Sequence, residues 1–237
     1  MKSGILIIGS LLWDKNQGSH INLRQKWRNK RLQMNKKIHV FAPIRYGRKS
    51  NGSYTMVFSK QAELDDNYGT AYFVPFKNSI NSFTGLKNQA EYLSNAEGAN
   101  DKKFVKGNKE KWCVIGILFN PNFDNEKKQR IITLFQQKLN SDGLGNEYTK
   151  FCIPNEPSIL TNQGELDINW LNAVNPKDQK ELNTYDFIIA ACPQQNEKSY
   201  PTPDSIREGV LIDIRDYFYS NIRSGITTYQ DRGIINS

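Results

Sequence analysis

The sequence predicts a single α+β domain spanning residues 1–237, because strand patterns and helix patterns both occur along it and no internal repeat is present. Residues 5–8 form an apolar run that is typical of a strand buried on both faces. Residues 125–139 place apolar side chains at the spacing of an amphipathic helix. The chain also contains 12 Phe, 11 Tyr and 4 Trp, which supply the apolar area that one core needs.

Further elements follow from the same patterns. We expect strands at residues 38–41, 54–58, 69–75, 111–119, 151–153 and 187–191. We expect a helix at residues 86–96 and a short helix at residues 167–171. Asn-Gly and further glycines predict an irregular connection at residues 43–52. In the C-terminal segment, residues 200–237, Thr202 is a candidate N-cap for an amphipathic helix that continues through Phe218. That helix would dock on the core or form a partner interface.

Composition narrows the class of protein. No run approaches the roughly 18 apolar residues of a membrane helix, and no signal-peptide pattern begins the chain. The three cysteines are scattered, which predicts a reducing, cytoplasmic setting. The two histidines have no second ligand at a suitable spacing, so we expect neither a metal nor a cofactor.

The formal net charge of +8 raises the question of a polyanionic partner. Much of this charge lies in residues 24–37, with the sequence RQKWRNKRLQMNKK. The apolar residues there have helical spacing, so the segment is either the solvated outer face of a helix or a nucleic-acid-binding surface. No known nucleic-acid-binding motif accompanies it, which favours the solvated face.

The loop after the first strand is the first candidate site. Gly9 and Ser10 interrupt the apolar run, and glycine permits a sharp turn or the close approach of a ligand. The N–H groups of Gly9, Ser10 and Leu11 would then form a concavity for a carboxylate or phosphate. The alternative is an ordinary strand followed by a tight turn.

Two other segments carry candidate side chains. Arg45, Arg48 and Ser50 lie in the expected connection, where guanidinium groups suit the recognition of a carboxylate, although exposed arginines are common in loops. Gly98 is a reasonable terminator of the helix at residues 86–96, which places Glu97 at the helix end. Glu97 is either a proton-transferring group or a solvated helix-end glutamate.

The order of these motifs resembles the gamma-glutamylcyclotransferase superfamily. The motifs are the Gly9-Ser10-Leu11-Leu12 loop, the arginine-containing strand-loop-strand, the strand at residues 69–75, and a helix ending in Glu97-Gly98. The resemblance covers about the first hundred residues. It implies a barrel-like mixed sheet flanked by helices, with residues 1–119 as the motif-bearing core and a C-terminal helical extension. It also implies that the loop binds the glutamyl carboxylate of a small-molecule amide and that Glu97 transfers a proton during its cleavage.

The chain departs from the family pattern at three points. Ile8 stands where the family usually has Tyr, and the interval from Gly69 to Glu97 is longer than in the family. Residues 93–96, Leu-Ser-Asn-Ala, also replace the usual Leu-Asp run before Glu-Gly. Glu91 is therefore a second candidate for the catalytic acid. The competing hypothesis is a non-catalytic binding module that recognises a small acid or a nucleic acid through the same pocket, Arg45, Arg48 and the basic segment.

Overall fold

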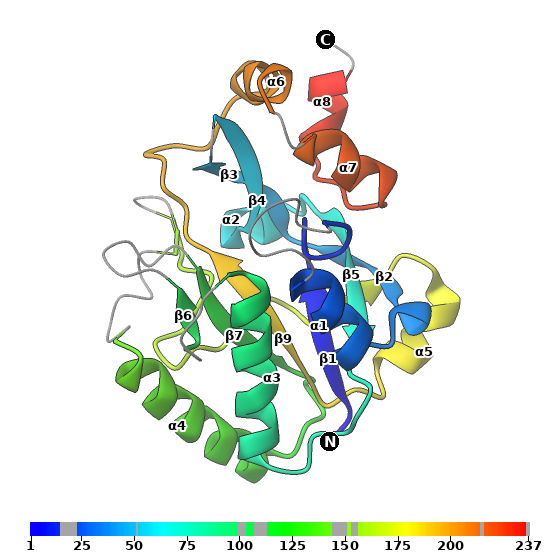
Figure 1. Ribbon diagram of the computed structural model, residues 1–237, viewed down its shortest axis with the longest axis vertical. Coiled ribbons are helices and arrows are strands. Elements are labelled where there is room, and N and C mark those ends of the chain that lie inside the picture. Colours follow the sequence, from blue (N-terminus) through cyan, green and yellow to red (C-terminus); the bar gives the residue numbers. More distant parts are fainter. Residues whose placement is uncertain are drawn as a thin grey trace.

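The computed structural model describes residues 1–14, 23–50, 52–98, 103–106, 113–143, 151–152, 156–213 and 216–235. Its centre is a seven-stranded mixed sheet in the order β6-β7-β9-β1-β5-β2-β8 (Figure 1). The strands, in that order, are Val105–Lys106, Cys113–Phe119, Phe187–Pro193, Ser3–Ile7, Gly69–Pro75, Ile38–Ala42 and Asn172–Ala173. β1 is parallel to β9, and every other pairing in this sheet is antiparallel.

β1 lies in the middle of the sheet. All five of its residues are buried, as the apolar run predicted, and Leu6 pairs with Phe73 of β5 on one side and with Ala190 of β9 on the other. The chain leaves the sheet after Ile7, so the residues that follow it emerge at one end of a fully covered strand. The loop that carries Gly9 and Ser10 is therefore positioned by a strand that is buried along its whole length.

A separate hairpin covers part of the sheet. β3 (Ile44–Ser50) pairs with β4 (Ser53–Phe58), so the prediction of an irregular connection at residues 43–52 was wrong. Ile44 and Tyr46 are buried on alternate positions of β3, and a bulge between Tyr46 and Arg48 interrupts the register. Gly52 turns the chain with a φ of 85°, which glycine adopts without steric cost.

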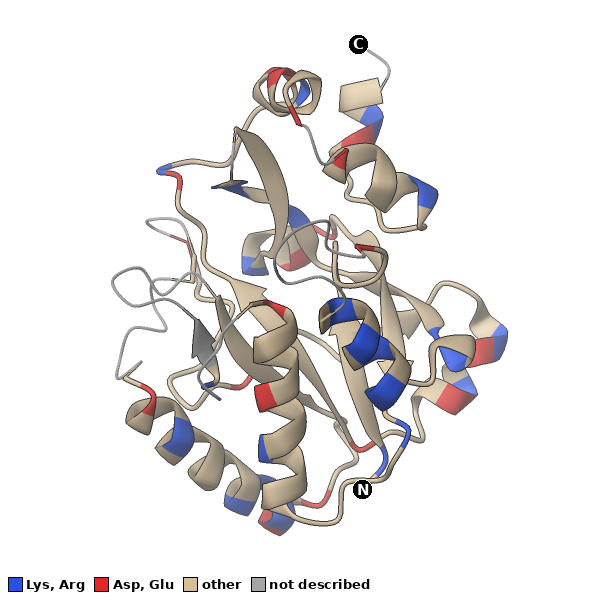
Figure 2. Ribbon diagram, in the orientation of Figure 1, with Lys and Arg blue, Asp and Glu red and all other residues tan. Residues whose placement is uncertain are grey.

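Helices cover the sheet and extend beyond it. α1 (Leu23–Arg31), α3 (Phe83–Ala96) and α4 (Asn125–Ser141) lie on one side of it, as Figure 1 shows. Lys26 and Lys30 of α1 are exposed, whereas Arg28 is buried and Arg24 and Arg31 are half-buried. Figure 2 shows the basic positions along this helix. The remaining short elements are η1 (Met34–Lys36), α2 (Lys60–Leu64), η3 (Pro176–Asp178) and α5 (Gln179–Leu182).

Two short elements expected from the sequence are not formed. Residues 167–171 are not helical, because the Glu63 carboxylate accepts a hydrogen bond from the Asn169 N–H (2.6 Å) and the segment is held against the core. Phe151 and Cys152 form a bend instead of a strand, and residue 153 lies outside the described residues.

The barrel-like core implied by the family resemblance also needs correction. The architecture is α+β and the sheet is mixed, as expected, but within the described residues the sheet stays open. Its edge strands β6 and β8 have two residues each and do not pair with one another, while the β3–β4 hairpin pairs only within itself. No helix among the described residues is both long enough and apolar enough to cross a membrane.

The C-terminal segment forms three helices instead of the single one expected. Thr202 caps α6 (Pro203–Leu211) as predicted, since its hydroxyl accepts a hydrogen bond from the Ser205 N–H (3.2 Å). α7 (Tyr217–Arg223) begins anew after Asp216, whose φ of 53° is incompatible with a continuous helix. α8 (Asp231–Ile235) ends the described chain. α6, α7 and α8 gather at one end of the molecule, near the β3–β4 hairpin (Figure 1).

Candidate functional site

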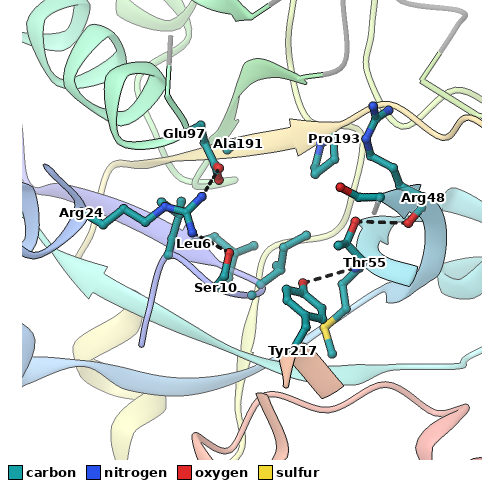
Figure 3. Close-up of a pocket in the computed structure, with 14 residues that line it drawn as sticks. Leu6, Ser10, Arg24, Arg48, Thr55, Glu97, Ala191, Pro193 and Tyr217 are labelled. Carbon is teal, nitrogen blue, oxygen red and sulfur yellow. Dashed lines mark hydrogen bonds and ion pairs between the residues drawn. The ribbon is translucent and has the colours of Figure 1, made fainter. Parts of the chain in front are cut away.

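A cavity of about 330 Å³ opens where β1 ends (Figure 3). It is enclosed by the loop after β1, the start of α1, the β3–β4 hairpin, the end of α3, the end of β9 and the start of α7. Its lining residues are Leu6, Ile8, Gly9, Ser10, Leu11, Arg24, Arg48, Ser50, Thr55, Met56, Glu97, Ala191, Pro193 and Tyr217. Segments from both ends of the chain therefore build one site.

The loop after β1 offers hydrogen-bond donors to this cavity. The Leu12 N–H donates to the Gly9 carbonyl (3.0 Å) and the Asp14 N–H donates to the Ser10 carbonyl (2.8 Å), which closes a tight turn. The N–H groups of Gly9, Ser10 and Leu11 make no hydrogen bond with any residue that the structure describes. Adjacent amides in such a turn form a concavity that suits an anion.

Two arginines of α1, one helical turn apart, hold this loop in place. The buried Arg28 guanidinium donates to the carbonyls of Leu11 (2.6 Å) and Asp14 (2.9 Å), and burial lowers the pKa of Arg28. Arg24 donates to the Ser10 hydroxyl (2.8 Å) and pairs with the Asp14 carboxylate (2.8 Å). The basic segment at residues 24–37 is therefore not only a solvated face, because two of its arginines turn inward.

Glu97 reaches the same cavity from the end of α3. Its N–H donates to the Leu93 carbonyl (3.0 Å), and Gly98 ends the helix with a φ of 91°. The Glu97 Oε2 lies 3.2 Å from Arg24 Nη2, and each of the two side chains is only 13% exposed. One guanidinium thus links the Glu97 carboxylate with the Ser10 hydroxyl (Figure 3).

Sequence reasoning missed Arg24 and Tyr217 as site residues. The Tyr217 hydroxyl projects from α7 against the loop, so that a Cβ at Gly9 would lie 2.5 Å from its oxygen. This oxygen accepts a long hydrogen bond from the Met56 N–H (3.4 Å), and burial raises the pKa of Tyr217, which keeps the hydroxyl protonated at neutral pH. The only sequence signal was an aromatic residue next to an apolar stripe.

The other predicted residues divide into two groups. Arg48 and Ser50 line the cavity from β3, and Arg48 donates to the Gln194 carbonyl (2.9 Å). Leu12, Arg45 and Glu91 do not line it. Leu12 is buried in the core, and the Arg45 guanidinium stacks on the Tyr200 ring, with its carbon 3.2 Å from the ring centre. Glu91 lies nearer to two lysines, Lys87 and Lys138, each 3.9 Å from its carboxylate.

Comparison with known proteins does not identify the site. No protein-family model matches this chain, and neither a curated protein nor a solved structure is significantly similar to it. Among the residues that the structure describes, no three His, Cys, Asp or Glu side chains are grouped as metal ligands. The relationship to gamma-glutamylcyclotransferases therefore stays a prediction from the order of motifs.

Proposed function

We propose that the cavity at the end of β1 binds a gamma-glutamyl-type amide and that Glu97 acts as the general acid and base in its cleavage. One observation carries this proposal: the unbonded N–H groups of the loop and the Glu97 carboxylate line the same cavity. An anion-binding loop and a proton-transferring group are the two parts that such a reaction needs.

The loop is suited to hold the acid end of the substrate. The N–H groups of Gly9, Ser10 and Leu11 would donate to the α-carboxylate, and the position of these donors is fixed because Arg28 holds the far side of the turn. Hydrogen bonds to a charged group are worth roughly 1.5–3 kcal/mol each. The carboxylate thereby fixes the α-amine of the substrate relative to its side-chain amide.

The chemical step is an intramolecular transfer. The α-amine nitrogen attacks the γ-carbonyl carbon, a new C–N bond forms, and the original amide C–N bond breaks. Glu97 accepts a proton from the attacking nitrogen and delivers it to the departing nitrogen, so the products are 5-oxoproline and a free amine. The protonated Tyr217 hydroxyl, which projects from α7 against this loop, is a further donor beside Ile8, which provides none.

A second candidate function is supported by the charges around the cavity. Two arginines, Arg24 and Arg48, line it together with one acidic residue, Glu97. This balance favours an anionic ligand whether or not the ligand reacts. A module that binds a small carboxylic acid without turnover would use the same loop.

Glu97→Gln tests the catalytic proposal. Gln retains the size of Glu but cannot carry a proton, so we expect kcat for 5-oxoproline release to fall by about 10²–10⁴-fold while substrate binding measured by calorimetry changes little. The substrates are a panel of gamma-glutamyl dipeptides together with glutathione. Ser10→Ala removes a hydroxyl from the binding loop and should act mainly on KM.

Glu91→Gln is the matched control, because it makes the same chemical change on the same helix outside the cavity. It should leave turnover unchanged. Release of 5-oxoproline at an unchanged rate from the Glu97→Gln protein would remove Glu97 from its role. No release from the unsubstituted protein, together with binding of a gamma-glutamyl ligand, would favour the binding module.

A further inference from the structure

A second hollow, of about 600 Å³, lies at the opposite end of β1 from the cavity described above. It is formed by residues around the start of β1, the segments after α1 and β5, and the region of α5. Its lining residues are Lys2, Ser3, Gln33, Lys36, Pro75, Phe76, Lys77, Asn78, Ser79, Lys177, Lys180, Glu181, Thr184 and Tyr185. Five of these residues are lysines, and only one is acidic.

Lysines outnumber the carboxylates in and beside this hollow, which are Glu181 in its lining and Asp186, whose side chain accepts a hydrogen bond from the Lys2 N–H (2.7 Å). The five lysines are exposed, and none of them forms an ion pair within the described residues. Burial raises the pKa of Tyr185 to about 12, and the interaction of its hydroxyl with Glu181 adds to this shift. Five like charges around one concavity repel one another, so an anion with several charges would stabilise the arrangement.

The basic surface continues from the hollow onto α1. The Lys77 N–H donates to the Arg31 carbonyl (2.8 Å), and the Lys77 ammonium group donates to the Asn29 carbonyl, so the end of α1 adjoins the hollow. Lys26 and Lys30 are exposed on this helix, and Lys37 is exposed just after it. Figure 2 shows the Lys and Arg residues of α1 beside those near the chain start. The charged surface is thus longer than a single phosphate group requires.

We propose that this hollow and the outer face of α1 bind the sugar-phosphate backbone of a nucleic acid without reading its sequence. Repeated phosphates match a row of lysines contributed by separate segments. The two aromatic residues in the lining, Phe76 and Tyr185, are buried and offer no face for stacking bases, which favours contact with the backbone over base recognition.

A membrane surface fits these observations less well. Peripheral attachment to a bilayer combines basic residues with exposed apolar side chains. None of the residues lining the hollow is an exposed large apolar residue, and Leu23, at the start of α1, is the one such residue described on that helix. The most exposed described ones, Leu64, Leu211 and Ile212, lie elsewhere in the fold. A concave surface also suits a rod-like polyanion better than a flat bilayer.

The test compares two triple variants that lower the net charge by the same amount. The site variant is Lys2→Gln/Lys77→Gln/Lys180→Gln, and the control is Lys127→Gln/Arg130→Gln/Lys198→Gln, in which all three residues are exposed and lie outside the hollow. Binding of a fluorescein-labelled DNA duplex of about 20 base pairs, and of the matching RNA duplex, is followed by anisotropy between about 50 and 200 mM salt.

We expect the unsubstituted protein and the control variant to bind with a steep salt dependence. The site variant should lose at least about tenfold in affinity at 100 mM salt, and its slope of log K against log salt should be smaller by about 2.7 on DNA, because three phosphate contacts are removed. Both triple variants should retain any turnover at the Glu97 cavity. The two proposals therefore fail independently.

Four results would overturn the inference. The first is no binding of either duplex by the unsubstituted protein at the lowest salt concentration. The second is equal weakening in the site and control variants, which would reflect net charge alone. The third is full competition by inorganic triphosphate at a concentration equal to that of the duplex phosphates. The fourth is preferential binding to vesicles of anionic phospholipid.

Discussion

The contact between Gly9 and Tyr217 predicts a specific non-additive effect on stability. In Gly9→Ala, the new Cβ would lie 2.5 Å from the Tyr217 hydroxyl oxygen, about 0.9 Å short of the 3.4 Å at which ordinary contact begins. Tyr217 is only 6% exposed and its ring packs beside Trp13, so it cannot move aside without disturbing α7. Such overpacking typically costs about 1–3 kcal/mol.

Removing the Tyr217 hydroxyl should remove the destabilisation caused by Gly9→Ala. The next nearest atoms of Tyr217 would lie 3.4 and 3.8 Å from the new Cβ, which is ordinary contact. In the Tyr217→Phe background, Gly9→Ala should therefore be neutral or should stabilise by about 0.4–1 kcal/mol, because alanine restricts the unfolded chain. Tyr217→Phe alone leaves the buried Met56 N–H without its acceptor, which costs about 1–3 kcal/mol, and this cost is common to both proteins that carry it.

The coupling between positions 9 and 217 is measured by urea unfolding of four proteins, followed by tryptophan fluorescence. They are the parent, Gly9→Ala, Tyr217→Phe and the double variant. We expect an interaction energy of about 1–3 kcal/mol between the two positions. The reasoning is refuted if Gly9→Ala costs the same in both backgrounds, because α7 would then not be packed over the loop. A change in the slope of the unfolding free energy against urea concentration, without a change in the midpoint, would indicate an effect on the unfolded chain. It would also contradict the contact between Gly9 and Tyr217.

Two further predictions concern buried charges. Arg28→Met removes the donor to the carbonyls of Leu11 and Asp14. It should therefore lower the free energy of unfolding by about 1.5–3 kcal/mol in urea titrations and weaken ligand binding at the cavity. Unchanged binding would show that the turn keeps its shape without Arg28. Burial raises the pKa of Asp231 above its ordinary value of 3.8, so the folded state binds this proton more tightly than the unfolded chain does. Its contribution to stability is therefore present below pH 3.8 and is lost as the pH rises through the raised pKa. Unfolding of the parent and of Asp231→Asn across this range should show the parent losing stability relative to the variant, and parallel curves would contradict the assignment.

The sequence was most informative where burial dominates. Residues 5–8, 69–75 and 187–191 read as strands because continuous apolar or β-branched residues suit a sheet covered on both faces, and the structure has β1, β5 and β9 there. β3 was not predicted, because Gly47 and three basic residues, Arg45, Arg48 and Lys49, obscure the alternation of Ile44 and Tyr46. Its strand conformation depends on pairing with β4, which no local pattern reveals.

The same distinction applies to the candidate site. Gly9, Ser10 and Glu97 each stand at the end of a regular element, so local signals of strand and helix termination drew attention to them. Arg24 and Tyr217 have no such signal. Arg24 meets Glu97 across 73 positions of the chain, and its place in a basic segment suggested a solvent-facing role. Contacts of this kind are set by how helices dock, not by the residues next to them in sequence.

The parallel pairing of β1 with β9 has a consequence for how the protein is made. Ser3 and Phe187 are partners in the sheet, and Trp13 donates to Asn221 across 208 positions. At a synthesis rate of about 5–20 residues per second, β1 leaves the ribosome about 10–40 s before the strand that completes its pairing. During this interval the nascent chain carries an apolar strand with one unpaired edge, which is the kind of segment that chaperones protect. The cavity acquires its last wall only when α7 has emerged, so a ribosome that stalls before residue 217 releases a chain that has the loop, α1 and Glu97 but no enclosed site.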